Sequence, residues 1–325
     1  MDTINKVGRK NNLIKSINLT EFAFKYGVVI ALFFLIALFT FLSDGVFIRG
    51  DNLINILQQV SVNTILAIGA TFVILTAGID LSVGSIVAFT GMVAASFVTG
   101  DNPNLLLAIV FGLSAGLILG MINGIFIAKF KIQPFIATLG MMAIARGATY
   151  IYSDGVPIAN LSDSYLFIGG GRIFGIPFSI FIVLIVTVIF IITLNKTKFG
   201  RHVFAVGGNE KAAIISGIQV NKVKILVYSI SGLLAGLAGI VISSRVTAGL
   251  PQAGMTFELD AIAAVVIGGT SLMGGKGRLW GTLVGALLLG VLNNGMDVIG
   301  VSSYWKEALK GCIIIAAVML DRKQH

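Results

Sequence analysis

The chain has few of the residues on which catalytic and metal sites are built. Its 325 residues include one cysteine and two histidines. The cysteine, Cys312, lies in an apolar run and has no second cysteine for an internal disulfide, so we expect it to serve packing. The sequence contains no HExxH or CxxC pattern and no paired histidines. It therefore predicts no catalytic residues, no metal site and no bound cofactor.

Charged residues are also scarce. Asp, Glu, Lys and Arg make up 11% of the chain, whereas soluble globular proteins have about 25%. Hydrophobic residues make up 56%, and the mean hydropathy is +0.98. Long apolar stretches recur, which excludes a soluble domain and indicates repeated membrane-spanning helices. The expected fold class is all-α: a polytopic membrane protein with about ten transmembrane helices.

The apolar stretches define the expected organisation of the chain. We expect one transmembrane domain, residues 26–325, behind a polar N-terminal tail, residues 1–25. The ten spans are placed near residues 27–42, 60–77, 82–99, 104–128, 134–151, 176–194, 223–243, 258–273, 279–296 and 303–320.

The net charge of +9 would suggest a nucleic-acid partner if the protein were soluble. Here the basic residues gather in alternate loops and near both ends, as Lys6, Arg9, Lys198 and Lys323 illustrate. The positive-inside rule therefore predicts that both termini lie in the cytoplasm. The charge indicates membrane topology, and we expect no nucleic-acid partner.

A weak internal repeat runs through the chain. The tripeptide TAG at 76–78 recurs at 247–249, and NG at 123–124 recurs at the same spacing at 294–295. With the predicted topology, spans 2–5 and 7–10 would be inverted repeats. Transporters built in this way place their pathway between the two halves.

Glycine is abundant, with 40 residues, and several glycines fall every four residues along the fourth, seventh and ninth spans. In lipid, small residues at this spacing let helix backbones approach closely. We interpret them as packing seams within one bundle. They are Gly112, Gly116, Gly120, Gly124, Gly232, Gly236, Gly281 and Gly285.

Uncharged polar residues within the spans are candidates for a solute pathway. Charged residues near mid-membrane are too few for a fixed ion or a charged solute, because each one is costly there and needs a partner. The sequence therefore favours an uncharged solute, a sugar before an amino acid. The candidate pathway residues are Asn63, Thr76, Ser85, Asn123, Asn293 and Asn294.

Two ionisable residues lie inside the apolar region, where a charge is costly, so the presence of each needs a physical explanation. Asp80 precedes the third span, where we expect it to cap the helix by accepting N–H bonds from Ser82 or Val83. Contact with the solute is the alternative. For Arg146 three roles remain open: snorkelling outward, bonding to loop carbonyls, or lining the pathway.

The glycine-rich stretch GGTSLMGGKGR (268–278) resembles a phosphate-binding loop but does not match one. Thr270 occupies the position of the first glycine in GxxxxGK[ST], and Gly277 follows the lysine. The chain therefore has no ATP site. If ATP drives transport, another subunit binds it.

The polar segment 195–223 separates two strongly apolar spans. Within it, GGNEKAAIISGI (207–218) predicts a short helix. Asn209 can cap its start, Glu210 suits its positive end, and Gly217 can adopt the left-handed conformation that ends a helix.

Small residues on this helix favour contact with a second protein. Ala212, Ala213 and Gly217 would present small side chains, so the helix could sit shallowly in a groove with close backbone contact. A plain connecting loop is the alternative interpretation.

Five stretches together resemble the permease subunits of ribose-type sugar ABC importers, and within that family the members that carry ribose. The likeness runs from about Asn52 to Arg322. The stretches are ILTAGIDLSVGSIVAFTG (74–91), KIQPFIATLGMMAIARG (131–147), GGNEKAAIISGI (207–218), ELDAIAAVVIGGTSLMGGKGR (258–278) and VLNNGMDVIGVSSYW (291–305).

The resemblance implies a permease in the bacterial inner membrane that carries a neutral monosaccharide, D-ribose. It implies three partners: a second permease copy, a cytoplasmic ATP-binding subunit with two nucleotide-binding halves, and a periplasmic sugar-binding protein. It also implies that the helix within 195–223 is the coupling helix that docks on the ATP-binding subunit. The residues concerned are Gly208, Asn209, Glu210, Ala212, Ala213, Ser216 and Gly217.

Three other classes of protein compete with this interpretation. An ion-coupled secondary sugar transporter would have titratable residues in the core of the bundle, and Asp80 keeps that alternative open. A passive channel would need no cytoplasmic docking helix. An intramembrane enzyme would need an assembled catalytic set.

Overall fold

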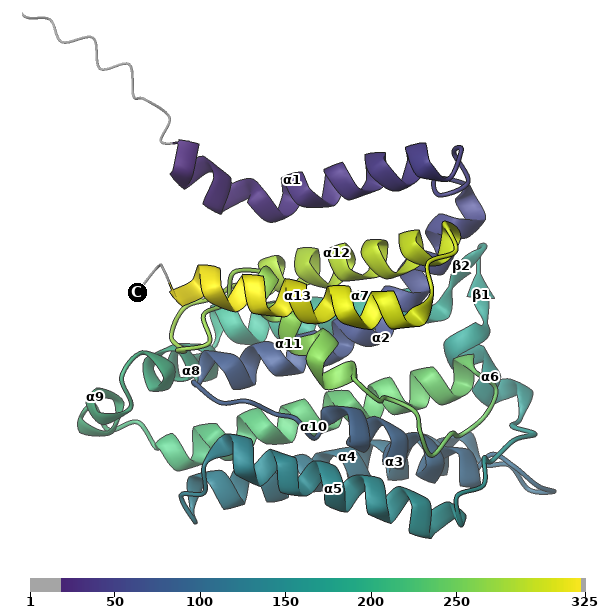
Figure 1. The fold of residues 1–325 in the computed structure, drawn as a ribbon. Coiled ribbons are helices and arrows are strands. Elements are labelled where there is room, and N and C mark those ends of the chain that lie inside the picture. Colours follow the sequence, from purple (N-terminus) through teal and green to yellow (C-terminus); the bar gives the residue numbers. More distant parts are fainter. Residues whose placement is uncertain (1–18, 323–325) are drawn as a thin grey trace, which may run out of the picture.

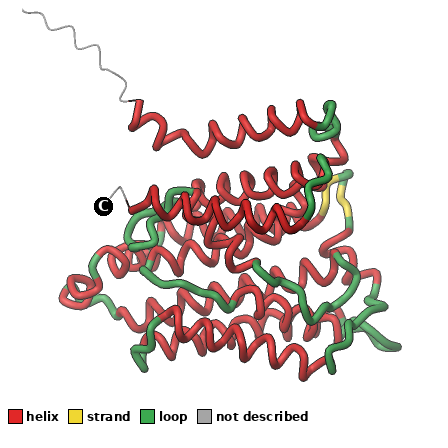
Figure 2. The backbone as a smooth tube through the Cα atoms, in the orientation of Figure 1, coloured by secondary structure: helices red, strands yellow, loops and turns green. Residues whose placement is uncertain are grey.

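The computed structural model describes residues 19–322, which form a bundle of thirteen helices and one short β-hairpin (Figures 1 and 2). The first helix begins at Leu19, inside the tail that the sequence predicts for residues 1–25. The rest of that tail, residues 1–18, lies outside the described residues.

The helices follow one another with short connections. Their bounds are α1 Leu19–Leu42, α2 Gly50–Leu75, α3 Val83–Ser96, α4 Leu105–Ala128, α5 Pro134–Ser153, α6 Asp163–Gly170, α7 Phe178–Lys196, α8 Lys198–Gly208, α9 Glu210–Ile215, α10 Val220–Arg245, α11 Phe257–Ile267, α12 Leu279–Val298 and α13 Ser303–Arg322. The hairpin pairs β1 Arg172–Ile173 with antiparallel β2 Ile176–Pro177, just before α7.

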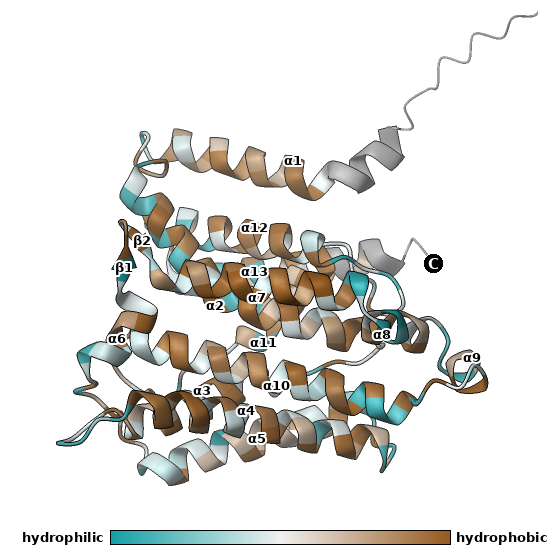
Figure 3. Cartoon of the chain, turned by 180° about the vertical axis from the view of Figure 1, so that it is seen from behind, coloured by the Kyte–Doolittle hydropathy of each residue, from teal (hydrophilic) through white to brown (hydrophobic). Residues whose placement is uncertain are grey.

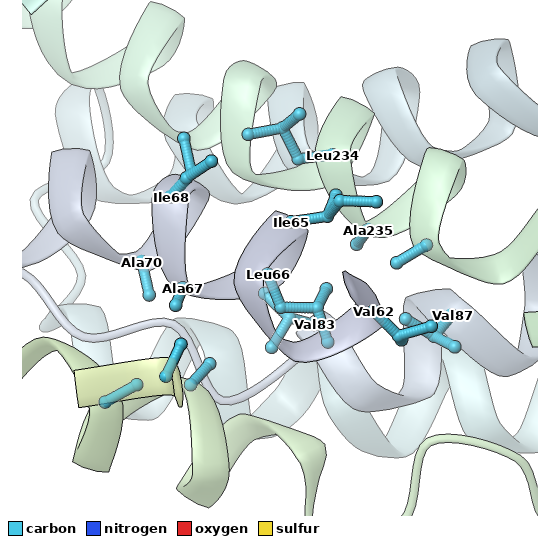
Figure 4. Packing of buried hydrophobic residues seen from close by; sticks show 14 of the residues in the cluster. Val62, Ile65, Leu66, Ala67, Ile68, Ala70, Val83, Val87, Leu234 and Ala235 are labelled. Carbon is cyan, nitrogen blue, oxygen red and sulfur yellow. The ribbon is translucent and has the colours of Figure 1, made fainter. Parts of the chain in front are cut away.

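The core lies around α2 and α10, the two helices of 26 residues. Most residues of both helices are buried, whereas less than a third of the apolar stretches of α4, α5 and α7 is buried. Figure 4 shows Ile65 and Leu66 of α2 near Leu234 and Ala235 of α10, with Val83 of α3 beside them. Hydrophobic residues run along the helices, and polar ones gather at the ends and loops (Figure 3). This distribution suits a bundle whose outer faces meet lipid.

The predicted glycine seams are confirmed. A Cβ added at Gly116 would lie 2.3 Å from the Gly232 carbonyl oxygen, and one at Gly120 would lie 2.3 Å from the Tyr228 carbonyl oxygen. The glycine stripe of α4 therefore packs directly on the backbone of α10. A Cβ at Gly285 would lie 2.1 Å from the Ala264 carbonyl oxygen, which shows the same packing between α12 and α11.

The expectation of about ten transmembrane helices is wrong. Within residues 19–322, six helices are long and apolar enough to cross a membrane: α2, α4, α5, α7, α10 and α12. At 1.5 Å per residue, α3 is about 21 Å long and α11 about 16 Å, which is short of the ~30 Å hydrocarbon core. The described apolar part of α1, Gly27–Leu42, is also short.

The charges Lys306, Glu307 and Lys310 lower the hydropathy of α13, the remaining helix of the predicted ten. The all-α, polytopic part of the prediction agrees with the structure. A helix lies within each apolar stretch, but apolar composition does not show where α3 and α11 end: residues 97–99 and 268–273, which the prediction included in spans, lie outside the helices.

The contacts between helices repeat along the chain. α10 packs against α2, α3 and α4, and α2 packs against α10, α11 and α12. Likewise, α3 lies against α4 and α5, as α11 lies against α12 and α13. The internal repeat in the sequence relates the group α2–α5 to the group α10–α13. Most contacts between the two groups are made by α2 and α10.

A valine at Gly120 tests the seam between α4 and α10. We expect Gly120→Val to destabilise the protein by about 1–3 kcal/mol or more, because the backbone of α10 leaves no room for a side chain. The matched control is Gly140→Val on α5, where an added Cβ meets nothing within 4 Å. The measurement is the temperature at which detergent-solubilised protein loses its monodisperse peak. Equal temperatures for the two variants would contradict the packing assignment.

Candidate functional site

The short helix α9 stands at one end of the bundle, between α8 and the start of α10 (Figure 1). Its predicted caps are confirmed. Asn209 accepts a hydrogen bond from the Ala212 N–H at 3.0 Å, and Gly217 has a φ of +81°. The Ile218 N–H donates to the Ala213 carbonyl at 3.0 Å, which is the bond expected at a left-handed helix end. The sequence therefore fixes both ends of this helix locally.

The side chains that α9 exposes differ from those expected. Ala213 is only 4% exposed, so the expectation that it presents a small side chain to a partner is wrong. Ile214 and Ile215 are 57% and 87% exposed. A helix of six residues has one inward face, and Ala213 occupies it because its small side chain fits against the protein body. The accessible apolar surface at the tip of α9 is therefore the isoleucine pair, flanked by the exposed Ala212.

Contacts with the bundle hold α9 in place. Lys224 of α10 forms an ion pair with Glu210 at 2.8 Å, and the Lys224 side chain is largely buried. Thr197 caps the start of the adjoining helix α8, because its hydroxyl accepts a hydrogen bond from the Gly200 N–H at 3.1 Å. The helix α8 buries Val203 and Val206. The segment 195–223 thus contains two packed helices, where the sequence indicated one.

The remaining residues proposed for coupling lie on the same surface. Gly208, Asn209, Ser216 and Gly217 are exposed. Their contact with a second protein stays a prediction.

The connection between α2 and α3 holds a buried polar network around Asp80. Ser82 donates to one Asp80 oxygen from both its hydroxyl, at 2.6 Å, and its backbone N–H, at 3.0 Å. Ser231 of α10 donates to the other oxygen at 2.8 Å. Asn123 of α4 donates its amide to the Ser82 hydroxyl at 2.8 Å. The network ties α3, α4 and α10 to one carboxylate.

The expected capping bond from Ser82 to Asp80 is therefore present, although the residue at the N-cap position is Ser82. No pattern in the sequence indicates the hydrogen bond from Ser231. Within this network the carboxylate already accepts three hydrogen bonds, so its structural role is explained without a solute.

The candidate pathway residues are spread over several helices, and no hydrogen bond among the described residues joins one of them to another. Asn123 belongs to the Asp80 network, while Asn294 accepts a hydrogen bond from Asn52 at 2.9 Å near the start of α2. Thr76 donates to the Val73 carbonyl at the end of α2. Asn63, Ser85 and Asn293 lie on α2, α3 and α12. Their role in a pathway stays a prediction.

Of the three roles that the sequence leaves open for Arg146, the structure shows bonding to loop carbonyls. Its guanidinium donates to the carbonyls of Pro251 and Ala253, at 2.7 and 2.9 Å, in the connection between α10 and α11.

Ion pairs link α13 to its neighbours. Lys310 pairs with the buried Asp260 of α11 at 3.1 Å, and Lys306 pairs with Asp297 of α12. The sequence contains no local signal for these pairs, because their members come from different helices.

Comparison with known proteins places the chain in a family. A family model described as "Branched-chain amino acid transport system / permease component" matches residues 52–318. The chain belongs to this permease family. No solved structure matches the chain.

Several curated permeases are similar to this one over nearly their whole length. It is 50% identical to the Ribose import permease protein RbsC of Escherichia coli over 301 residues, which are 91% of this chain and 93% of that protein. It is 48% identical to the Ribose import permease protein RbsC of Bacillus subtilis, covering 92% and 93%. It is 40% identical to the D-allose transport system permease protein AlsC of Escherichia coli, covering 95% and 94%. The permease is thus a multi-pass membrane protein.

Removing the Asp80 carboxylate tests its structural role. We expect Asp80→Ala to lower stability by about 1–3 kcal/mol, because Ser82 and Ser231 lose a buried acceptor. Asp80→Asn retains an acceptor and should lose less, and Asp101→Ala changes an exposed carboxylate as the control. Thermal stability in detergent is the measurement. An Asp80→Ala protein as stable as Asp101→Ala would contradict the role.

Proposed function

We propose that the chain is the membrane permease subunit of an ABC importer that carries a neutral monosaccharide, with D-ribose as its cargo. The observation that carries the proposal is the 50% identity, over 91% of the chain, to a ribose import permease. The lower identity to the allose permease, at 40%, favours ribose over allose. The absence of a phosphate-binding loop from the sequence supports ATP hydrolysis by a separate subunit.

The proposed assembly contains two copies of this permease in the bacterial inner membrane, with both termini in the cytoplasm. A cytoplasmic ATP-binding subunit with two nucleotide-binding halves lies below, and a periplasmic sugar-binding protein delivers the sugar from outside. The basic residues near both ends of the chain support this orientation. Nothing in the comparisons favours the ion-coupled alternative.

In this assembly, α9 docks on the ATP-binding subunit. Its tip offers an exposed isoleucine pair on a helix that is capped at both ends and held to α10 by an ion pair. Adjacent apolar side chains that are exposed on one surface favour contact with an apolar groove of a partner protein. Closure of the ATP-binding subunit would press on α9 and shift the helices packed behind it.

Sugar uptake tests the proposed cargo and energy source. Cells that lack their own ribose permease receive this chain together with its ATP-binding and sugar-binding partners. We expect uptake of labelled ribose, with unlabelled ribose competing better than allose, galactose or xylose. Disabling the ATP-binding subunit should abolish uptake. Uptake that survives this change and collapses with the ion gradient would contradict the proposal.

A charge at the tip of α9 tests the docking surface. Ile215→Asp should weaken association with the ATP-binding subunit at least about tenfold, because a carboxylate would be desolvated in an apolar contact. Ile215→Leu keeps the apolar surface and should behave as the wild type. Val156→Asp places the same charge at an exposed position between α5 and α6, at the opposite end of the bundle.

Co-purification of the ATP-binding subunit with the tagged permease measures the effect. Wild-type recovery of that subunit with Ile215→Asp would exclude α9 as its docking site.

A further inference from the structure

Three segments that are distant in the sequence meet at the end of α2. They are the end of α2 with the residues that follow it, the end of α8, and the glycine-rich loop 268–278 between α11 and α12. We name their meeting point the glycine joint. It consists of Leu75, Ala77, Gly207, Gly274 and Gly275.

The glycine joint is held by backbone contact. The Gly275 N–H donates to the Leu75 carbonyl at 3.0 Å. A Cβ added at Gly207 would lie 1.7 Å from that same carbonyl oxygen and 2.6 Å from the Gly275 nitrogen. A Cβ added at Gly274 would lie 2.8 Å from the Ala77 nitrogen. All three glycines are therefore needed for the chains to approach this closely.

The loop at the joint has a defined shape of its own. Gly274 and Gly275 have φ values of +82° and +70°, and Ala77 opposite them has a φ of +57°. The Ser271 N–H donates to the Lys276 carbonyl at 3.0 Å, and the Gly274 N–H donates to the Ser271 carbonyl at 3.0 Å. Internal bonds of this kind make the loop a fixed turn that can transmit a displacement.

The joint connects the docking helix to the bundle by short paths. α8 ends at Gly208, and Asn209 caps α9 directly after it. Beyond Leu75 the chain leads to Asp80 and its network with α4 and α10. Beyond loop 268–278 lies α12, which packs against α2. One set of backbone contacts therefore connects the segment before α9 to α2, to α12 and to the Asp80 network.

We propose that the glycine joint moves as one unit with α8 and α9, so that force from the ATP-binding subunit passes through it to α2 and α12. This inference rests on the proposed function. It also gives a role to two glycines of the stretch GGTSLMGGKGR, which the sequence alone led us to compare with a phosphate-binding loop. Gly274 and Gly275 allow close contact with the backbone at the ends of α8 and α2.

The first experiment adds one methyl group to the joint. The permease is co-expressed with its ATP-binding subunit and reconstituted with the sugar-binding protein. We expect Gly207→Ala to reduce ribose uptake about tenfold. The ATP-binding subunit should still co-purify, and ATP hydrolysis should continue, because α9 remains exposed.

Uncoupled hydrolysis of this kind separates a transmission defect from general misfolding, which would lose the complex. The control is Gly50→Ala at the far end of α2, where an added Cβ meets nothing within 4 Å. It should transport as the wild type does.

The second experiment follows the wild-type joint without any substitution. The Gly275 N–H donates to the Leu75 carbonyl across the joint, so its exchange with deuterium reports whether the joint stays closed. Hydrogen–deuterium exchange is measured on the complete complex with and without ATP. If the joint moves as one unit, the peptide that contains Gly275 should exchange equally slowly in both states.

The outcomes separate the inference from the proposed function. Wild-type uptake and coupling in Gly207→Ala, or faster exchange of the Gly275 peptide when ATP binds, would overturn the joint. If Gly207→Ala does not reach the membrane, the exchange experiment on the wild-type complex decides alone. Failure of the wild-type complex to accumulate ribose, or loss of the ATP-binding subunit from wild type, would instead overturn the proposed function.

Discussion

Lipid is as apolar as leucine, so two helices in a membrane gain little by burying apolar side chains against each other. Close backbone contact has to supply the attraction, and in this protein glycine makes it possible. Where the glycine stripe of α4 faces α10, carbonyl oxygens of α10 occupy the space that side chains on α4 would need. Because α10 is also the neighbour of α2 and α3, this seam positions the centre of the bundle.

Non-helical chain inside such a bundle must find partners for its polar groups, since lipid offers none. The connection after α2 meets this requirement with Asp80, Ser82 and Ser231, and the connection after α10 meets it with the guanidinium of Arg146. Both short helices, α3 and α11, follow these connections. The polar networks thus allow the helices to be shorter than the membrane is thick.

Close backbone contact at glycines and hydrogen bonds to a buried carboxylate also connect the segment next to α9 with the centre of the bundle. The ends of α8 and α2 touch through backbone atoms, and the chain beyond α2 is fixed by the Asp80 carboxylate. If α9 receives the driving force, as we propose, a stiff connection carries its displacement to the helices behind it, because soft contacts would absorb that displacement.

The sequence by itself determined the membrane class, the glycine seams, the two caps of α9 and the family resemblance. Each of these follows from composition, helical spacing or the chemistry of neighbouring residues. It could not determine where α3 and α11 stop, that Ala213 turns inward while Ile215 turns outward, or that Ser231 bonds to Asp80. Only the tertiary structure decided these features, because they depend on which distant segments lie next to each residue.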